Sequence, residues 1–412
     1  MSVKVIYEIH FPKYFVQTFI IFNNFGCYSP IPIDPWQFGV DQIDPALCTH
    51  LVYSFAILDE TTFQITPMTP AVDIGQEFYK KFTDLKSQNP SLKTMLAFGG
   101  WGDSNINDKY SQLVSSSQNI ETFVLSVVQL LVEFNFDGLD VDWEYPKTDA
   151  DKVGFINLLV ALKTAFAQNG FILSVAVPGL ANDYGKWFLT IFSIFIAIEN
   201  SPCDDDFVRH DETGYDIPAI EDAVDFINLM SYDFHGAWEP ESADHHAPLR
   251  KRSWDTAGLN VADGVEYWIA NGLTAAKINL GIPLYGHSWK LSSDVTSPPA
   301  PANGVGPPGP FTSEDGVMSY YEICDAVQNS DWQVFQDPDQ LIGPYAVSPT
   351  GVIRRQTWVG YDDVTMVTTK SNYLLSRGLG GAMVWEISLD DFRTSCGVKN
   401  PLITAISRIV LP

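Results

Sequence analysis

The 412-residue sequence is poor in positive charge, with 24 Lys and Arg against 50 Asp and Glu and a formal net charge of −26. An electrostatic field of that sign repels phosphate groups, so nucleic acids and anionic membrane surfaces are poor partners. No apolar run reaches the ~18 residues that a bilayer crossing needs. The longest, Trp187 to Ile198, has twelve. We therefore expect neither a nucleic-acid partner nor a membrane association.

Cysteine is also scarce, and the sequence contains no C-x-x-C pair, which argues against a zinc knuckle or a thioredoxin-type redox site. The number of cysteines allows two disulfides and one unpaired thiol, but spacing alone does not show the pairing. The five are Cys27, Cys48, Cys203, Cys324 and Cys396. The amino terminus lacks a small-residue cleavage site, so it is a poor signal peptide as written.

Apolar residues make up 46% of the chain, enough for a large core, and aromatic residues reach 13%, including 11 Trp. Aromatic rings of this number suit stacking against flat apolar surfaces such as sugar rings. Core packing is nevertheless the commoner use of any single Trp.

Short apolar, β-branched runs alternate with helix-like segments along most of the chain, which predicts βαβ units and a parallel sheet. Two of the amphipathic segments are 120–135 and 152–170, and the second ends in Asn169-Gly170, a helix stop signal. A further strand near residues 23–28 would bring the number of strands to eight, which favours an α/β fold of the (β/α)8 TIM-barrel type. The seven other predicted strands lie in 51–58, 94–100, 136–146, 171–178, 226–236, 278–286 and 380–387.

One segment breaks the alternation. Residues 287–360 contain the Pro- and Gly-rich stretch SPPAPANGVGPPGP, a helix-like run and short aromatic runs. This pattern predicts a small α+β insertion domain after the seventh strand. The expected organisation is an atypical amino-terminal segment (1–26), barrel strands 1–7 (27–286) with an atypical insert (188–214), the insertion domain (287–360), and the barrel end with strand 8 (361–412).

The most informative residues are the acids of the fourth predicted strand. Strand side chains alternate between faces, so Asp140, Asp142 and Glu144 point the same way, toward the carboxyl-terminal rim where barrel active sites lie. Three carboxyls in an apolar interior repel one another, so they must be protonated, hydrogen-bonded or bound to metal. A divalent cation is one interpretation, but no nearby His or Asn cluster completes a shell. The other is a raised pKa that makes Glu144 a general acid near neutral pH.

The same segment, FDGLDVDWEYP, resembles the D-G-x-D-x-D-x-E signature of glycoside hydrolase family 18, the chitinase family. Further segments resemble animal-type chitinases in the family's order and extend the resemblance over roughly residues 27–410. They are IDPALCTHLVYSFA (43–56), LKTMLAFGGW (92–101), INLMSYDFHGAWE (227–239), YYEIC (320–324) and GGAMVWEISLDDF (380–392).

The resemblance implies an endo-acting chitinase that hydrolyses β-1,4 links of N-acetylglucosamine polymers with retention, using the substrate's own acetamide as nucleophile. Glu144 would protonate the glycosidic oxygen and then act as base on water. Asp142 would hydrogen-bond the acetamide N–H, and Asp140 would lie beneath it and share its charge. Tyr232 would donate to the acetamide oxygen. Asp137 breaks the two-residue spacing and is interpreted as structural support.

The resemblance also assigns residues that would contact the sugar, and it requires neither metal nor organic cofactor. They are Asp233, Trp385, Trp101, Trp238, Tyr285, Met230 and Tyr28, with His287 a weaker candidate. For Trp101 and Trp238 the alternative is a packed surface aromatic, and for Met230 it is plain core packing.

By the same match Cys324 would pair with Cys396 and Cys27 with Cys48, which implies an oxidising, extracellular setting and a secreted protein. We expect a monomer whose partners are chitin and chitooligosaccharides. The main alternative is a chitinase-like lectin that binds these oligomers without cutting them, and a metal-dependent barrel hydrolase is a third possibility. Residues 1–26 and 188–214 fit the family poorly, and our hypothesis is that they are translated non-coding sequence or a wrong start.

Overall fold

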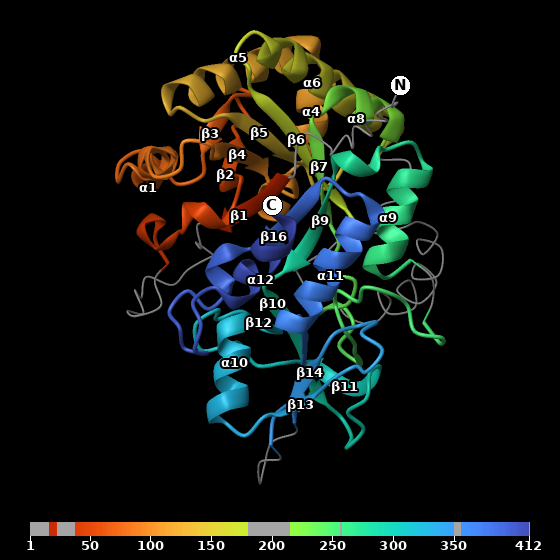
Figure 1. The fold of residues 1–412 in the computed structure, drawn as a ribbon. Helices are drawn as coiled ribbons and strands as arrows, with labels where there is room; N and C mark the ends of the chain where they lie inside the picture. Colours follow the sequence, from red (N-terminus) through yellow and green to blue (C-terminus); the bar gives the residue numbers. More distant parts are fainter. Residues whose placement is uncertain (1–15, 23–37, 180–214, 256–257, 350–355, 412) are drawn as a thin grey trace, which may run out of the picture.

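The structure, a computed structural model, describes residues 16–22, 38–179, 215–255, 258–349 and 356–411 (Figure 1). For residues 16–22 the description is limited to the backbone. Tyr28, Cys27, Cys203 and the insert 188–214 therefore lie outside the described residues, and the predictions made for them stay predictions.

Eight parallel strands form a closed barrel, as the sequence predicts. They follow the order β1-β16-β9-β7-β6-β5-β4-β2, and β1 also pairs with β2, which closes the ring. A short strand, β3 (Ile65–Pro67), adds to β2 in antiparallel orientation. The barrel strands are β1 (Val16–Phe22), β2 (His50–Leu58), β4 (Lys93–Gly99), β5 (Gly138–Asp142), β6 (Ile172–Pro178), β7 (Phe226–Met230), β9 (Ile278–Pro283) and β16 (Gly381–Trp385).

The first strand departs from the prediction. It runs from Val16 to Phe22 instead of near 23–28, so the strand that closes the barrel comes from the segment 1–26 that was set apart as atypical. Its sequence VQTFIIF is an apolar run rich in β-branched and aromatic residues, which suits a strand that is paired on both sides.

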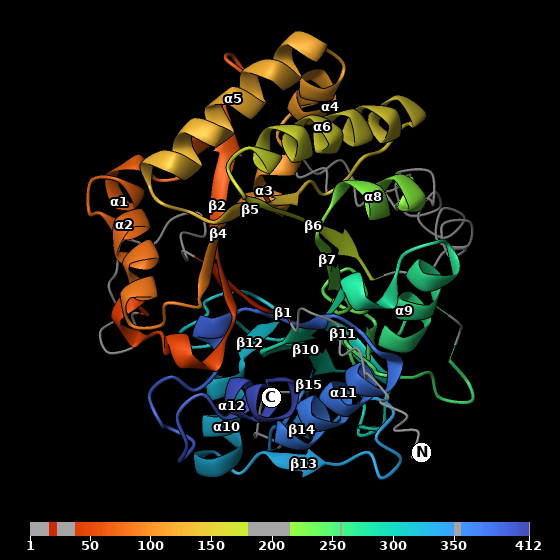
Figure 2. The same ribbon diagram turned by 45° about the horizontal axis from the view of Figure 1, so that its top comes forward.

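Helices surround the barrel (Figure 2). The two helices expected from amphipathic spacing are present but begin three residues earlier than predicted. In α6 the reason is a capping box in which Thr148 and Asp151 satisfy each other's backbone N–H. The helices outside the insertion are α1 (Pro70–Asp73), α2 (Phe78–Thr83), α3 (Trp101–Ser104), α4 (Lys109–Val114), α5 (Ser117–Glu133), α6 (Asp149–Ala167), α8 (Ile217–Ala223), α9 (Val261–Ala270), α11 (Val364–Arg377) and α12 (Pro401–Val410), with short 3-10 turns at 40–42, 45–47, 84–87, 275–277 and 387–389.

A second, antiparallel sheet follows the seventh barrel strand, β9, and confirms the predicted α+β insertion (Figure 1). It begins at Tyr285, two residues after β9 ends at Pro283, so this sheet joins the barrel at its carboxyl-terminal rim. Its strands are β10 (Tyr285–Leu291), β11 (Ala300–Val305), β12 (Val317–Ser319), β13 (Gln333–Phe335), β14 (Tyr345–Val347) and β15 (Thr357–Tyr361), with helix α10 (Tyr320–Asn329) and a short strand β8 (Ser242–Ala243) from the loop after β7.

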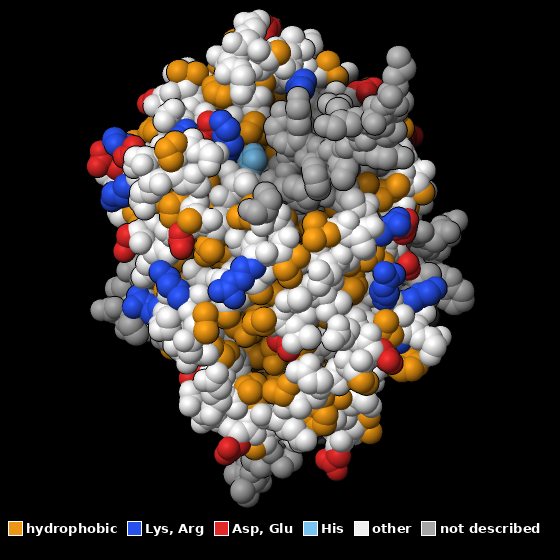
Figure 3. Space-filling view, in the orientation of Figure 1, with side chains coloured by type: hydrophobic (Ala, Val, Ile, Leu, Met, Phe, Trp, Pro, Cys, Tyr) orange, Lys and Arg blue, Asp and Glu red, His pale blue; other side chains and the backbone are white. Residues whose placement is uncertain are grey.

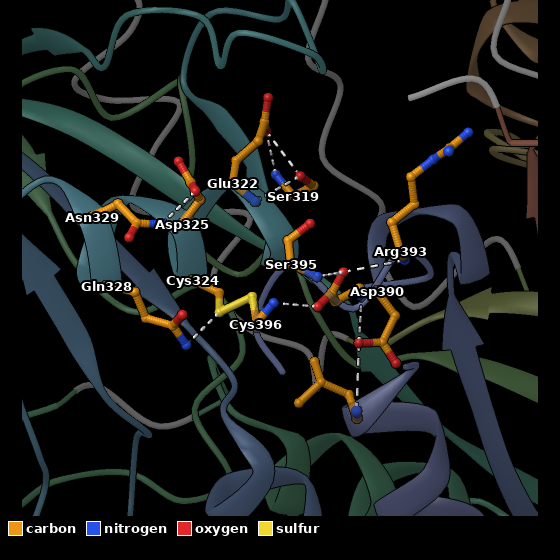
Figure 4. Close-up of a disulfide and its surroundings, with 12 residues drawn as sticks. Ser319, Glu322, Cys324, Asp325, Gln328, Asn329, Asp390, Arg393, Ser395 and Cys396 are labelled. Atoms are coloured by element: carbon orange, nitrogen blue, oxygen red, sulfur yellow. Dashed lines mark hydrogen bonds between the residues drawn. A yellow bond between two sulfur atoms is a disulfide. The ribbon is translucent and has the colours of Figure 1, made fainter. Parts of the chain in front are cut away.

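One disulfide joins the insertion to the end of the barrel. Cys324 on α10 is bonded to Cys396, with a Cα–Cα distance of 6.0 Å, and the backbone N–H of Cys396 donates to Asp391 (Figure 4). This pairing confirms one of the two predicted bonds. Cys48 is buried and is not bonded to any described cysteine, and because its predicted partner Cys27 lies outside the described residues, that pairing stays a prediction.

The distribution of basic side chains and the character of the helices concern the expected absence of nucleic-acid and membrane partners. On the face shown in Figure 3, the Lys and Arg side chains of the described residues lie in small separate groups. No helix in the described ranges combines the length and the apolarity that crossing a membrane requires.

Candidate active site

The acids of β5 reach the barrel interior because the strand alternates as predicted. Leu139 and Val141 belong to the apolar core between strands and helices. Asp140 and Asp142, on the opposite face, are also buried. The alternation places the two carboxyls one above the other inside the barrel, with Glu144 beyond them at the rim.

Asp140 is held by polar side chains from the next two strands. Its Oδ1 accepts hydrogen bonds from Ser174 Oγ at 2.5 Å and Asn228 Nδ2 at 3.0 Å, and Asn228 Oδ1 accepts in turn from Asn279 Nδ2 at 3.1 Å. Burial raises the Asp140 pKa to about 6, although both hydrogen bonds oppose the rise. These three supporting residues were not predicted. The available signal was a polar residue at an inward position of an otherwise apolar strand.

Asp142 and Glu144 form a coupled pair. Burial, then the charges of Glu144 and Asp140, raise the pKa of Asp142 well above its usual range. The buried Asp142 Oδ1 has no hydrogen-bond partner among the described residues. Burial also raises the pKa of Glu144 to about 7, against hydrogen bonds from the Tyr145 hydroxyl and the Trp101 backbone. A carboxyl at the rim that holds its proton near neutral pH has the property required of a general acid.

Two glycines let strands β4 and β5 meet closely at this rim. The backbone N–H of Gly100 donates to the Asp142 carbonyl at 2.7 Å, and a Cβ on Gly99 would lie 2.1 Å from that oxygen. Both glycines have positive φ, 116° at Gly99 and 80° at Gly100, a backbone conformation that favours glycine. The backbone N–H of Glu144 donates to Ser104 Oγ at 3.0 Å, which fixes the residue that carries the outer carboxyl.

Asp233 lies at the centre of a second polar cluster, just after β7. Its Oδ1 accepts from Tyr285 Oη at 2.6 Å and lies 2.9 Å from His287 Nε2 and 3.3 Å from His246 Nδ1. Burial opposes ionisation of Asp233, but hydrogen bonds and charges from the two histidines outweigh it and hold its pKa below the usual range. His287 was a weak candidate in the sequence, and His246 was not predicted.

Apolar and aromatic groups line the space between the two clusters. Tyr232 is buried, with its Oη 3.7 Å from the Met383 sulfur and its ring 6.2 Å from that of Tyr285. Met230 and Trp385 pack against the hydrophobic cluster that contains Tyr232, Tyr285 and Met383.

The other two predicted aromatics lie further out. Trp101, at the start of α3, is 47% exposed, and Trp238 lies edge-on to His287 at 5.9 Å. The structure therefore brings Trp385 and Met230 to the centre and leaves Trp101 toward solvent.

Asp137 lies at the opposite end of β5, as its broken spacing suggests. It pairs with Lys86 at 2.9 Å and Lys93 at 3.7 Å and accepts from the Thr94 backbone N–H at 2.8 Å. These contacts join β5 to neighbouring segments, in agreement with a supporting role.

The closed parallel barrel carries a row of carboxyls (Asp140, Asp142 and Glu144) and aromatic rings at its carboxyl-terminal rim, where barrel enzymes have their active sites. The sequence profile of Glycosyl hydrolases family 18 matches residues 22–390, and the chain belongs to this family. The predicted resemblance is thereby confirmed.

The relatives include chitinases of insects. The chain is 35% identical over 405 residues to the Endochitinase of Manduca sexta, covering 94% of this chain and 66% of that protein. It matches only 15% of the length of Probable chitinase 10 from Drosophila melanogaster. The solved Group II chitinase catalytic domain 2 of Ostrinia furnacalis aligns with a TM-score of 0.82 at 35% identity, covering 96% of each chain.

One of the structural neighbours is described as a pseudo-chitinase. Human YKL-39, described as a pseudo-chitinase with retained chitooligosaccharide binding properties, aligns with a TM-score of 0.78 at 32% identity over 96% of this chain and 99% of that one. Family membership therefore includes both enzymes and lectin-like binders, and the choice between them depends on the site residues.

Proposed function

We propose that this chain is a secreted, endo-acting chitinase that hydrolyses β-1,4 links of N-acetylglucosamine polymers by substrate-assisted catalysis with retention. One observation supports this most strongly: the Glu144 carboxyl, at the barrel rim, has a pKa raised to about 7 and lies next to the buried, coupled Asp142. When the environment gives two neighbouring carboxyls different pKa values, one can act as the general acid while the other stabilises charge.

The proposed reaction has two steps. Glu144 gives its proton to the glycosidic oxygen while the acetamide oxygen of the same sugar attacks the anomeric carbon, forming an oxazolinium ion and releasing the leaving sugar. Glu144, now a carboxylate, then takes a proton from the water that opens this ion.

Asp142 and Tyr232 would orient the acetamide. The Asp142 Oδ1 that lacks a partner in the described structure would accept the acetamide N–H, which meets the requirement that a buried polar atom be hydrogen-bonded. Tyr232 would donate to the acetamide oxygen, and Asp140 beneath would share the charge of Asp142.

The remaining predicted residues would hold the sugar chain. Trp385 and Met230 would form the apolar floor, Asp233 and Tyr285 would hydrogen-bond the same sugar, and the rings of Trp101 and Trp238 would stack further along. A role for Tyr28 stays a prediction from the sequence. No metal or organic cofactor is needed for these steps.

Hydrolysis of a soluble N-acetylglucosamine oligomer by the purified chain tests the proposal. Glu144→Gln should keep oligomer binding but lower kcat by at least ~10²-fold, the usual scale for losing general acid–base catalysis. Glu133→Gln, at an exposed glutamate on α5, is the matched control and should behave like the parent. Equal turnover of the Glu144→Gln variant and the parent would refute the assignment.

The lectin alternative is favoured by the pseudo-chitinase neighbour. The same experiment separates the two, because a folded parent that binds the oligomer without cleaving it is a lectin. A secreted protein is supported by the Cys324–Cys396 bond, since disulfides persist in oxidising compartments. Sedimentation of the purified chain tests the expected monomer.

A further inference from the structure

Three potential metal ligands converge at the edge of the candidate active site. Within the described ranges, Asp233, His246 and His287 each offer one ligand atom, and these three atoms all lie within 4.8 Å of one another. Asp233 and His246 come from the loop that follows β7, thirteen residues apart, and His287 comes from strand β10 of the insertion.

Both histidines are oriented in the same way. His246 Nε2 lies 3.1 Å from the Tyr285 carbonyl oxygen, and His287 Nδ1 lies 3.3 Å from the Gly316 carbonyl oxygen. The second nitrogen of each ring faces Asp233 Oδ1. A backbone carbonyl can only accept, so it favours the tautomer whose N–H points toward it, whereas the Asp233 carboxylate favours the opposite one, in which the ring donates to Oδ1.

The first of these tautomers leaves the other nitrogen of each ring with a lone pair directed at Asp233 Oδ1, and a cation bound there would replace the protons that the second tautomer places between the rings and the carboxylate. Two imidazole lone pairs and one carboxylate thus point into the same small space, an arrangement that a cation would stabilise. Metal-binding histidines characteristically donate their remote N–H to a carbonyl or carboxylate, which is the geometry found here.

The donor set indicates which cations fit. Two imidazole nitrogens and one carboxylate oxygen suit Zn²⁺ or Cu²⁺, whereas Mg²⁺ and Ca²⁺ prefer an all-oxygen shell. Both rings are buried, but the Asp233 side chain is 43% exposed. An ion could therefore enter from the cleft side and keep a position for water.

We infer that Asp233, His246 and His287 form a binding site for a single Zn²⁺ or Cu²⁺ ion, and that the bound ion inhibits hydrolysis. The Asp233 oxygen that would bind the ion is the one that accepts from Tyr285 Oη at 2.6 Å. Metal binding would take this carboxylate away from Tyr285 and from the sugar. The inhibition, unlike the metal binding, rests on the proposed function.

Copper binding to the purified full chain tests the site directly. Equilibrium dialysis should find one tightly bound Cu²⁺, and its electron paramagnetic resonance spectrum should show coupling to two nitrogens. His246→Gln and His287→Gln should each weaken binding at least ~10-fold and reduce the coupled nitrogens to one.

His235→Gln is the matched control, because His235 faces a carboxylate, Glu239 Oε2 at 2.7 Å, but does not belong to the group of three. It should bind copper like the parent. Thermal unfolding without metal establishes that each variant is folded, and Asp233→Asn provides a third, independent removal of a ligand. Absence of stoichiometric binding by the parent, or unchanged binding by both histidine variants, would overturn the site.

The inhibition is measured separately. Cu²⁺ or Zn²⁺ should suppress hydrolysis by the parent, a chelator should restore it, and His246→Gln should raise the inhibitory concentration at least ~10-fold. Copper bound without inhibition would overturn the inhibitory role. A parent that binds copper but never hydrolyses the oligomer would overturn the proposed function and leave the metal site established.

Discussion

Replacing Asp142 by Asn should move the alkaline limb of the pH–rate profile to lower pH. Burial raises the pKa of both carboxyls, and in the parent the loss of the last proton of the Asp142–Glu144 pair also places two negative charges together, a repulsion that adds to the rise at Asp142. An amide at position 142 removes the like charge. Glu144 then gives up its proton more readily, so the protonated acid disappears at a lower pH.

The expected size is worked from the spacing of an extended chain, since Glu144 lies two residues beyond the end of β5. Residues two apart in such a chain are separated by about 7 Å. At an effective dielectric constant of about 20, two unit charges at that separation interact by about 2.4 kcal/mol, or about 1.7 pKa units. We therefore expect the limb to shift by one to two pH units. Turnover should also fall, because the amide replaces the group proposed to accept the acetamide N–H.

The assay is kcat/KM on a fluorogenic chitooligosaccharide from about pH 4 to pH 10 at constant ionic strength. Asp137→Asn is the control, since it removes a carboxyl from the amino end of the same strand, about 16 Å away along the chain. Its profile should match that of the parent. If the Asp142→Asn profile also matched, the two carboxyls would not share a proton, and the assignment of Glu144 as an acid tuned by its neighbour would be refuted.

Three further predictions concern binding and stability. Trp101→Ala should raise the Kd for a chitooligosaccharide ~3–10-fold by calorimetry and leave Tm unchanged, because the ring is 47% exposed; unchanged affinity would contradict stacking there. Lys370→Met should lower the free energy of unfolding, measured in urea, by ~3–5 kcal/mol, because the buried Asp362 carboxyl would lose the Lys370 ammonium that lies 2.5 Å from it. Adding Asp362→Leu should recover most of this loss. Replacing Cys324 and Cys396 by Ser should cost ~2–4 kcal/mol, since the bond closes a loop of 72 residues, and a loss below ~1 kcal/mol would show that the crosslink constrains the unfolded chain little.

The carboxyl file was predictable because it depends on one local rule. Alternation along a strand determines that Asp140 and Asp142 share a face, and the structure places both inside the barrel. The first strand was not predictable by the same means. It was expected near residues 23–28 to complete a set of eight strands, whereas Val16–Phe22 is placed by pairing with β2 and β16, two strands more than 25 residues away.

The Asp233 cluster shows why part of the site could not be predicted from local sequence patterns. Tyr285 and His287 are two residues apart on β10, so they face the same side, but what they face depends on how the insertion sheet joins the barrel. Between them, Gly286 lets β10 lie close to β15 within the insertion sheet, because a Cβ there would lie 2.6 Å from the Gly360 carbonyl of β15.

The loop after β7, which supplies Asp233 and His246, is held by a contact within the loop and by pairing with the insertion sheet. The Phe234 backbone N–H donates to the His246 carbonyl at 2.8 Å, and β8 within the same loop pairs with β11 of the insertion. Barrel and insertion therefore position this cluster together. A change in the insertion sheet would alter the histidine cluster directly, and it would also affect Glu144, because the charge of Asp233 contributes to the rise in the Glu144 pKa.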